Sequence, residues 1–191
     1  MRTGPAGQFA ASAALAAALL CLTACSRPQA LPVFGQVPHF VLTDSNGLQF
    51  DSHVLDGKVW VADFFFTSCT DLCPRMTSQM HWVSRQVEDV AGARFVSFTV
   101  DPEHDTPPVL ADYAKRFRAE PERWFFLTGA QPVLQKLDFD TFKLGSVDGS
   151  LTHSTRFVLV DRRSRIRGYY STDDDTGLKP LVPAIRRLAK E

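Results

Sequence analysis

The stretch that decides the fold lies at residues 59–74 and reads VWVADFFFTSCTDLCP. Its first eight residues form a nearly continuous apolar run, which is typical of a strand buried on both faces of a parallel sheet. The run leads directly to Cys69 and Cys73, which three residues separate. Pro74 suits the first turn of a helix, where a missing N–H costs nothing. The stretch therefore predicts a strand, a loop that carries two cysteines, and a helix.

Apolar segments on either side of this stretch predict the rest of the fold. The helix after the cysteines extends to about residue 90, because apolar residues recur there at helical spacing. The last two predicted strands flank a polar turn and form a hairpin. An α/β fold follows, with a central mixed sheet flanked by helices and an N-terminal β-hairpin extension. Further strands are predicted at 94–100, 124–127, 154–160 and 166–170, and further helices at 108–117, 132–139 and 177–190.

The composition is that of an ordinary globular protein. The chain has 191 residues, of which 45% are apolar, and its 21 basic side chains equal its 21 acidic ones. A zero net charge argues against nucleic acid as a partner, because such binding normally needs a basic excess.

The N-terminus carries an export signal. An apolar run of about 14 residues follows Arg2, which suits a signal peptide and falls short of the ~20 residues that span a bilayer. The sequence LTAC at residues 22–25 resembles a bacterial lipobox and predicts a lipid on Cys25. The alternatives are that Cys25 is an ordinary residue of the segment, or that cleavage occurs nearby without lipidation. We expect three parts: a lipoprotein signal peptide at 1–24, a lipid anchor and proline-rich tether at 25–37, and the folded domain at 38–191.

The two cysteines that remain in the domain are expected to be redox-active or metal-binding. A disulfide across so short a loop constrains the unfolded chain little, so a purely structural role is disfavoured. A helix N-terminus favours thiolate over thiol, and we expect both Cys69 and Cys73 to benefit from it. Soft thiolates favour Cu(I) or Zn(II), and an imidazole would complete a trigonal or tetrahedral site.

One histidine stands out as the third ligand. His153 falls just before the strand at 154–160, where thioredoxin-like folds bring a loop against their redox cysteines. Thioredoxins carry a cis-proline there, and this sequence has none. His104 follows a strand end, a common place for functional groups, but its acidic neighbours favour a solvated loop. The remaining histidines are expected to have ordinary surface or packing roles: His39, His53 and His81.

Four segments resemble the Sco/SenC family. The family signature is C-x-x-x-C-P after an aromatic-rich strand, and three further segments follow in the family's order. Together they cover most of the chain from residue 38 to residue 190, so the resemblance is specific. The segments are FFFTSCTDLCP at 64–74, VDPEHDTP at 100–107, WFFLTG at 124–129 and THSTRFVLVD at 152–161.

The resemblance implies a thioredoxin-like fold and a copper site. In the family the two motif cysteines and the distal histidine bind copper, and these positions match Cys69, Cys73 and His153. Copper would be Cu(I), with Cu(II) as a further state. Asp71 and Asp101 match family acids that orient the site or meet a partner; helix capping and loop solvation are equally good explanations for them.

The implied function is that of a copper chaperone or thiol reductant that helps assemble the binuclear copper centre of cytochrome c oxidase. The partners would be oxidase subunit II or another copper-receiving protein, thioredoxin-like reductants, and the membrane through Cys25. The domain would face the periplasmic side of a bacterial cell envelope. Thr70 departs from the proline that many members have inside the cysteine loop, which bears on loop stiffness and redox poise.

Two other functions remain open. An envelope thiol:disulfide oxidoreductase needs only Cys69 and Cys73 and their reversible disulfide, without obligatory copper, so the sequence leaves open whether the chain is an enzyme. A copper-storage or copper-sensing lipoprotein is also compatible. A peroxidase is disfavoured because the pattern P-x-x-x-T-x-x-C does not precede Cys69.

Overall fold

The computed structural model describes residues 30–144 and 154–191. Two of the predicted site residues, Cys25 and His153, lie outside the described residues, whereas Cys69 and Cys73 lie within them.

The strand that was predicted from the apolar run is β4 (Val59–Phe65), and all seven of its residues are buried. Its side chains pack alternately on the two sides of the sheet. Phe64 contacts Phe142 on one side, and Phe65 contacts Tyr113 on the other. Because both faces are covered, this position requires an almost unbroken apolar sequence. The prediction of a strand buried on both faces is confirmed.

Within the described residues, eight strands form one mixed sheet in the order β1-β8-β7-β4-β5-β6-β2-β3. β4, β5 and β6 are parallel to one another, and the remaining neighbours pair antiparallel. The predicted N-terminal hairpin is formed by β2 and β3 and joins the sheet at β6. Besides β4, the strands are β1 (Gly35–Gln36), β2 (Val41–Asp44), β3 (Gln49–Asp51), β5 (Ala93–Thr99), β6 (Trp124–Thr128), β7 (Arg156–Val160) and β8 (Arg165–Ser171).

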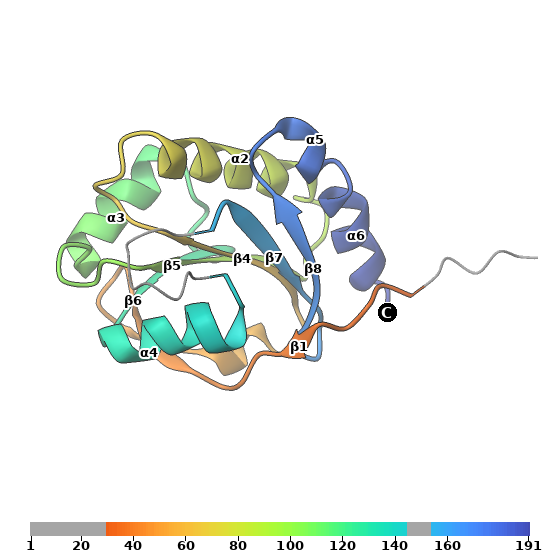
Figure 1. The fold of residues 1–191 in the computed structure, drawn as a ribbon, viewed down its shortest axis with the longest axis horizontal. Coiled ribbons are helices and arrows are strands. Elements are labelled where there is room, and N and C mark those ends of the chain that lie inside the picture. Colours follow the sequence, from red (N-terminus) through yellow and green to blue (C-terminus); the bar gives the residue numbers. More distant parts are fainter. Residues whose placement is uncertain (1–29, 145–153) are drawn as a thin grey trace, which may run out of the picture. The chain divides into compact units, whose positions relative to one another are not determined.

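Helices cover both faces of the sheet, as predicted. Figure 1 shows α2, α5 and α6 over one face and α4 against the other. Among residues 30–144 and 154–191, no helix combines the length and apolarity needed to cross a bilayer. The helices are α2 (Leu72–Gln86), α3 (Pro107–Arg116), α4 (Gln131–Gln135), α5 (Asp175–Leu178) and α6 (Leu181–Leu188), with a 3-10 turn η2 (Ser52–Leu55) and a π-helical segment η3 (Lys136–Thr141).

The C-terminal helix predicted at 177–190 is divided in two. α5 ends at Leu178 and α6 begins at Leu181. Pro180 lies between them and has no N–H to donate to the carbonyl of Thr176, so the helical hydrogen bonds are interrupted there.

The predicted tether at 25–37 is too long, because its last residues belong to the domain. Residues 32–191 form one unit. Gly35 and Gln36 pair with β8, and Val37, only 4% exposed, donates its N–H to the carbonyl of Ser164 at 2.8 Å. No strand is predictable at residues 35–36 from local pattern, because β1 is only two residues long and lies among prolines.

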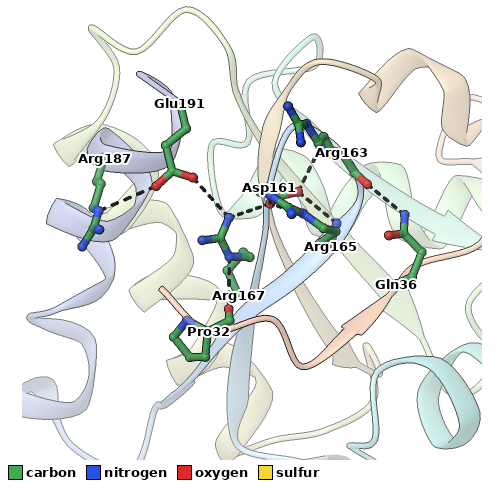
Figure 2. Close-up of polar contacts among 8 residues, drawn as sticks. All are labelled: Pro32, Gln36, Asp161, Arg163, Arg165, Arg167, Arg187 and Glu191. Atoms are coloured by element: carbon green, nitrogen blue, oxygen red, sulfur yellow. Dashed lines mark hydrogen bonds and ion pairs between the residues drawn. The ribbon is translucent and has the colours of Figure 1, made fainter. Parts of the chain in front are cut away.

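A buried carboxylate fastens the turn between β7 and β8. Asp161 is 4% exposed, and its side chain accepts hydrogen bonds from the backbone N–H groups of Arg163 and Arg165. The guanidinium groups of Arg165 and Arg167 reach the other carboxylate oxygen, each at 2.7 Å at the closest (Figure 2). Burial raises the pKa of Asp161, but these hydrogen bonds outweigh burial and hold its pKa below the usual range.

Arg167 extends this network to both ends of the described domain. It is 3% exposed, and its guanidinium also donates to the carbonyl of Pro32 at 3.1 Å and to the carboxylate of Glu191 at 3.2 Å. Figure 2 shows these residues converging on Arg167. The first and last segments of residues 32–191 are therefore tied to one hairpin.

Replacing Arg167 with Met should lower the free energy of unfolding by about 3 kcal/mol, because the buried Asp161 carboxylate loses its most buried cation. Urea denaturation at pH 7 measures this. The matched control is Arg163→Ala. This substitution removes an exposed arginine side chain but keeps the network intact, because Arg163 contributes to the network through its backbone N–H and carbonyl. It should change stability by less than about 0.5 kcal/mol. Equal effects of the two substitutions would contradict this account.

Candidate functional site

The two cysteines lie where β4 ends and α2 begins. Cys73 is the second residue of α2, and Cys69 lies in the loop before it. Both are thiols, not joined in a disulfide. The backbone N–H of Cys73 points at the sulfur of Cys69, with a distance of 3.4 Å between N and Sγ. The loop therefore folds back so that the first amides of the helix face the first sulfur.

The environments of the two thiols differ. Burial raises the pKa of Cys69, but the N–H groups of Cys73, Asp71 and Leu72 lower it more, and the net pKa is below the usual value. Cys73 is fully buried, and burial raises its pKa strongly, with smaller contributions from the charges of Cys69 and Asp63. The prediction that the helix N-terminus favours thiolate is confirmed for Cys69. It is wrong for Cys73, whose burial outweighs the helix.

A buried acid that was not predicted holds the cysteine loop in place. Asp105 has no exposed surface and accepts hydrogen bonds from the N–H and the hydroxyl of Thr67. It also accepts one from the hydroxyl of Thr99 at 2.6 Å. Thr67 lies two residues before Cys69, so Asp105 links the loop after β5 to the loop that carries the thiols. The segment DPEHDTP signalled a functional loop, but three acids in it left open which one is buried.

The other predicted polar residues lie nearer to solvent. Asp71 precedes α2 and is exposed, and its side chain makes no capping hydrogen bond to the helix. Asp101 is half-buried and His104 is exposed. Within the described residues, no group of three metal-binding side chains includes Cys69 or Cys73. The three-ligand set with His153 therefore stays a prediction.

The chain re-enters the sheet close to the cysteine loop after the gap in the described residues. Val158 of β7 pairs with Ala62 of β4 in antiparallel register. Continuing that register, residues before Val158 run alongside the last residues of β4, from which the cysteine loop departs. Ser154, the first described residue after the gap, lies two residues before β7 begins.

A buried polar layer lies beneath Cys73. The hydroxyl of Thr77 donates to the carbonyl of Cys73 at 2.8 Å and bonds to the hydroxyl of Tyr113 at 3.0 Å. Asp63, in β4, is 1% exposed and accepts one hydrogen bond, from the hydroxyl of Ser97 at 2.6 Å. Burial raises the pKa of Asp63, the Ser97 hydrogen bond offsets this only in part, and the resulting pKa is about 7.

Replacing Asp63 with Asn should stabilise the protein at alkaline pH. The folded-state pKa of Asp63 is raised, so its acid form is favoured by folding, and stability falls as the pH rises from about 4 to about 7. Asn does not titrate, so the variant should be more stable than the wild type by about 4 kcal/mol at pH 8 and almost unchanged at pH 4. Urea denaturation across this pH range measures the difference. The exposed control Asp71→Asn should not reproduce it, and a pH-independent effect of Asp63→Asn would contradict the assignment.

The fold and the site together define a class: a thioredoxin-like domain whose central strand leads into a pair of cysteines at the start of a helix. The SCO1/SenC family model matches residues 32–190. The chain belongs to the SCO1/SenC family.

Solved structures of this family resemble the chain over most of their length. A SCO1/SenC family lipoprotein from Bacillus anthracis is 31% identical, with 86% of this chain and 98% of that chain covered and a TM-score of 0.73. BsSco, in which a disulfide switch was identified, is a member of the Sco family of cytochrome c oxidase assembly proteins; it is 27% identical, with coverages of 85% and 99% and a TM-score of 0.75. Copper-bound ScoI from Bradyrhizobium japonicum is 25% identical, with coverages of 79% and 98% and a TM-score of 0.64.

Proposed function

We propose that this protein binds copper in the cell envelope and helps assemble the copper centre of cytochrome c oxidase. The observation that carries the proposal is the pair of thiols that β4 and α2 bring to one loop, in a chain that belongs to the SCO1/SenC family. Two relatives support it, ScoI with copper bound and BsSco of the oxidase assembly proteins. Oxidase subunit II is the copper acceptor that we propose.

Copper is held by Cys69, Cys73 and His153 in this proposal. Two thiolates and an imidazole form a soft donor set that suits Cu(I). The geometry of the cysteine loop supports this copper site, because the pKa of Cys69 is already lowered and the N–H of Cys73 faces the Cys69 sulfur. His153 directly precedes Ser154, where the chain rejoins the sheet beside β4. Asp71 and Asp101 flank the site as residues that orient it or meet the partner.

Replacing His153 with Ala should weaken Cu(I) binding by about 100-fold or more, since even outer-shell changes at metal sites typically cost 10–100-fold. Both thiols remain, so reduction and formation of the Cys69–Cys73 disulfide should largely survive. A Cu(I) competition titration against a chelator of known affinity, run beside a disulfide-reduction assay, measures both properties.

The matched control for this experiment is His104→Ala, which removes an exposed histidine of the neighbouring loop and should leave Cu(I) affinity unchanged. Cys69→Ser should abolish both properties. In cells, the His153→Ala strain should lose oxidase activity and recover part of it with added copper. Unchanged Cu(I) affinity in His153→Ala would remove this residue from the site.

A thiol:disulfide oxidoreductase is the second candidate, and the difference between the two thiols favours it. Cys69 is partly exposed and has the lowered pKa of an attacking thiolate. Cys73 is buried behind it and is placed to resolve a mixed disulfide, which releases the reduced partner and leaves the Cys69–Cys73 disulfide. A thioredoxin-like reductant would then restore the dithiol. The disulfide switch identified in BsSco supports such chemistry.

The proposed anchor is a lipid on Cys25, after removal of residues 1–24 as a signal peptide, with the domain on the periplasmic side of the membrane. The lipobox-like LTAC at residues 22–25 and the lipoprotein from Bacillus anthracis support it.

Replacing Cys25 with Ser should move the protein from the membrane fraction to the soluble fraction, because the thioether that carries the lipid cannot form. Cell fractionation followed by mass spectrometry of the N-terminal peptide measures this. Cys21→Ser is the matched control and should leave fractionation unchanged. An unmodified Cys25 in the wild-type membrane fraction would refute the anchor.

A further inference from the structure

Two histidines and an aspartate lie close together on the surface beside the β2–β3 hairpin. One ring nitrogen each of His39 and His53 and a carboxylate oxygen of Asp51 lie within 4.8 Å of one another. His39 Nε2 is 2.9 Å from Asp51 Oδ1. The two imidazoles stack with their centroids 4.3 Å apart and 22° between their planes. We propose that these three residues form a second metal site, for a divalent transition-metal ion such as Zn(II) or Cu(II).

The backbone under this cluster is fixed. Phe40 and Ser52 exchange two hydrogen bonds of 3.0 Å, one from each backbone N–H, which clamp the segment before β2 to the start of η2. Asp51 caps η2 by accepting the N–H of His53 at 2.9 Å. The three ligand residues are therefore held at one place by strand pairing and a cap, and their exposed side chains remain able to adjust.

A fourth residue supports the cluster from outside. His53 Nδ1 lies 2.9 Å from Asp56 Oδ2, and this hydrogen bond raises the pKa of His53. Metal-binding histidines commonly have such a carboxylate partner, which orients the ring and makes it a better donor. The arrangement of Asp56 behind His53 is therefore that of an oriented metal ligand.

The donor set selects the class of ion. Two imidazole nitrogens and one carboxylate oxygen suit borderline ions such as Zn(II) and Cu(II), whereas Mg²⁺ and Ca²⁺ prefer oxygen alone and Cu(I) prefers thiolate. Ligands at about 2.0–2.1 Å from a tetrahedral Zn²⁺ lie about 3.3 Å apart. The distance between His39 Nε2 and Asp51 Oδ1 must therefore increase slightly, and any longer distance between two ligand atoms of the cluster must decrease. Rotation of the exposed side chains allows both changes. With three protein ligands, at least one coordination position is left for water or an external ligand.

The cluster is separate from the cysteine loop. It lies beside a surface hollow of about 280 Å³ that Trp60 and Arg162–Ser164 also line. Trp60 is at the beginning of β4, whereas Cys69 follows its end. Arg162 and Arg163 place positive charge near the hollow, which should hold the affinity for a cation below that of a closed structural site.

A Zn²⁺ titration of the full-length chain in detergent tests the proposal. Cys69→Ser and Cys73→Ser are introduced so that the cysteine loop offers no thiol, and Cys21 and Cys25 are alkylated beforehand. Isothermal titration calorimetry at pH 7.5 should then detect one equivalent of Zn²⁺. Adding His39→Ala or His53→Ala should weaken this binding by ~30-fold or more, as expected for removal of a direct ligand.

His104→Ala is the matched control, since it removes another exposed histidine and should leave the Zn²⁺ affinity unchanged. Zn²⁺ should also slow modification of His39 and His53, but not of His104, by diethylpyrocarbonate, as measured by peptide mass spectrometry. Circular dichroism verifies that each variant is folded. No bound equivalent, or equal weakening in all three histidine variants, overturns the proposal. Because both cysteines of the loop are absent, that outcome leaves the proposed copper function untouched.

Discussion

The structure depends on the burial of β4 on both faces. Trp60, Ala62 and Phe64 belong to the core on one side, while the side chains between them meet the helices on the other. A strand enclosed in this way cannot shift its register without moving apolar side chains into mismatched cavities, so its two ends are fixed in space. The cysteine loop starts at one of these ends. Its position is therefore set by packing, before any polar contact of the loop is considered.

Buried carboxylates then fix two loops that adjoin the central strands of the sheet. Asp105 joins the cysteine loop to the loop after β5, and Asp161 fastens the turn that follows β7. Both acids are almost fully enclosed, so their hydrogen bonds compensate for a large loss of hydration. Asp63 differs from them because it has one hydrogen bond from Ser97 and, among the residues that the structure describes, no ion pair with a cation, and its raised pKa reflects that difference. A buried acid thus anchors a loop where several hydrogen-bond donors surround it. Where such donors are few, as at Asp63, burial raises the pKa of the acid toward neutral pH.

The sequence predicted what depends on local pattern. The apolar run of β4, the helix after Cys73 and the hairpin after the gap could be read because apolar periodicity and turn residues report burial directly. Contacts that depend on register between distant segments could not. The pairing of β1 with β8 requires knowing which sheet edge residues 35–36 join, and no local pattern encodes that. The meeting of His39 with Asp51 and His53 depends on the register of the β2–β3 hairpin, in which Val41 pairs with Asp51, and the predicted hairpin carried no register. The difference between the two thiols was hidden for the same reason, since it depends on how deeply the helix places Cys73.

That difference bears on what each proposed chemistry demands of the site. Disulfide exchange requires one thiolate at a time, and the partly exposed Cys69, with its lowered pKa, meets this requirement while Cys73 stays a buried thiol. The copper site that we propose needs both sulfurs as thiolates, so loading it would release the proton that burial keeps on Cys73. In that proposal a buried second cysteine would couple copper binding to proton release at Cys73, whereas dithiol chemistry needs no such release before Cys69 attacks.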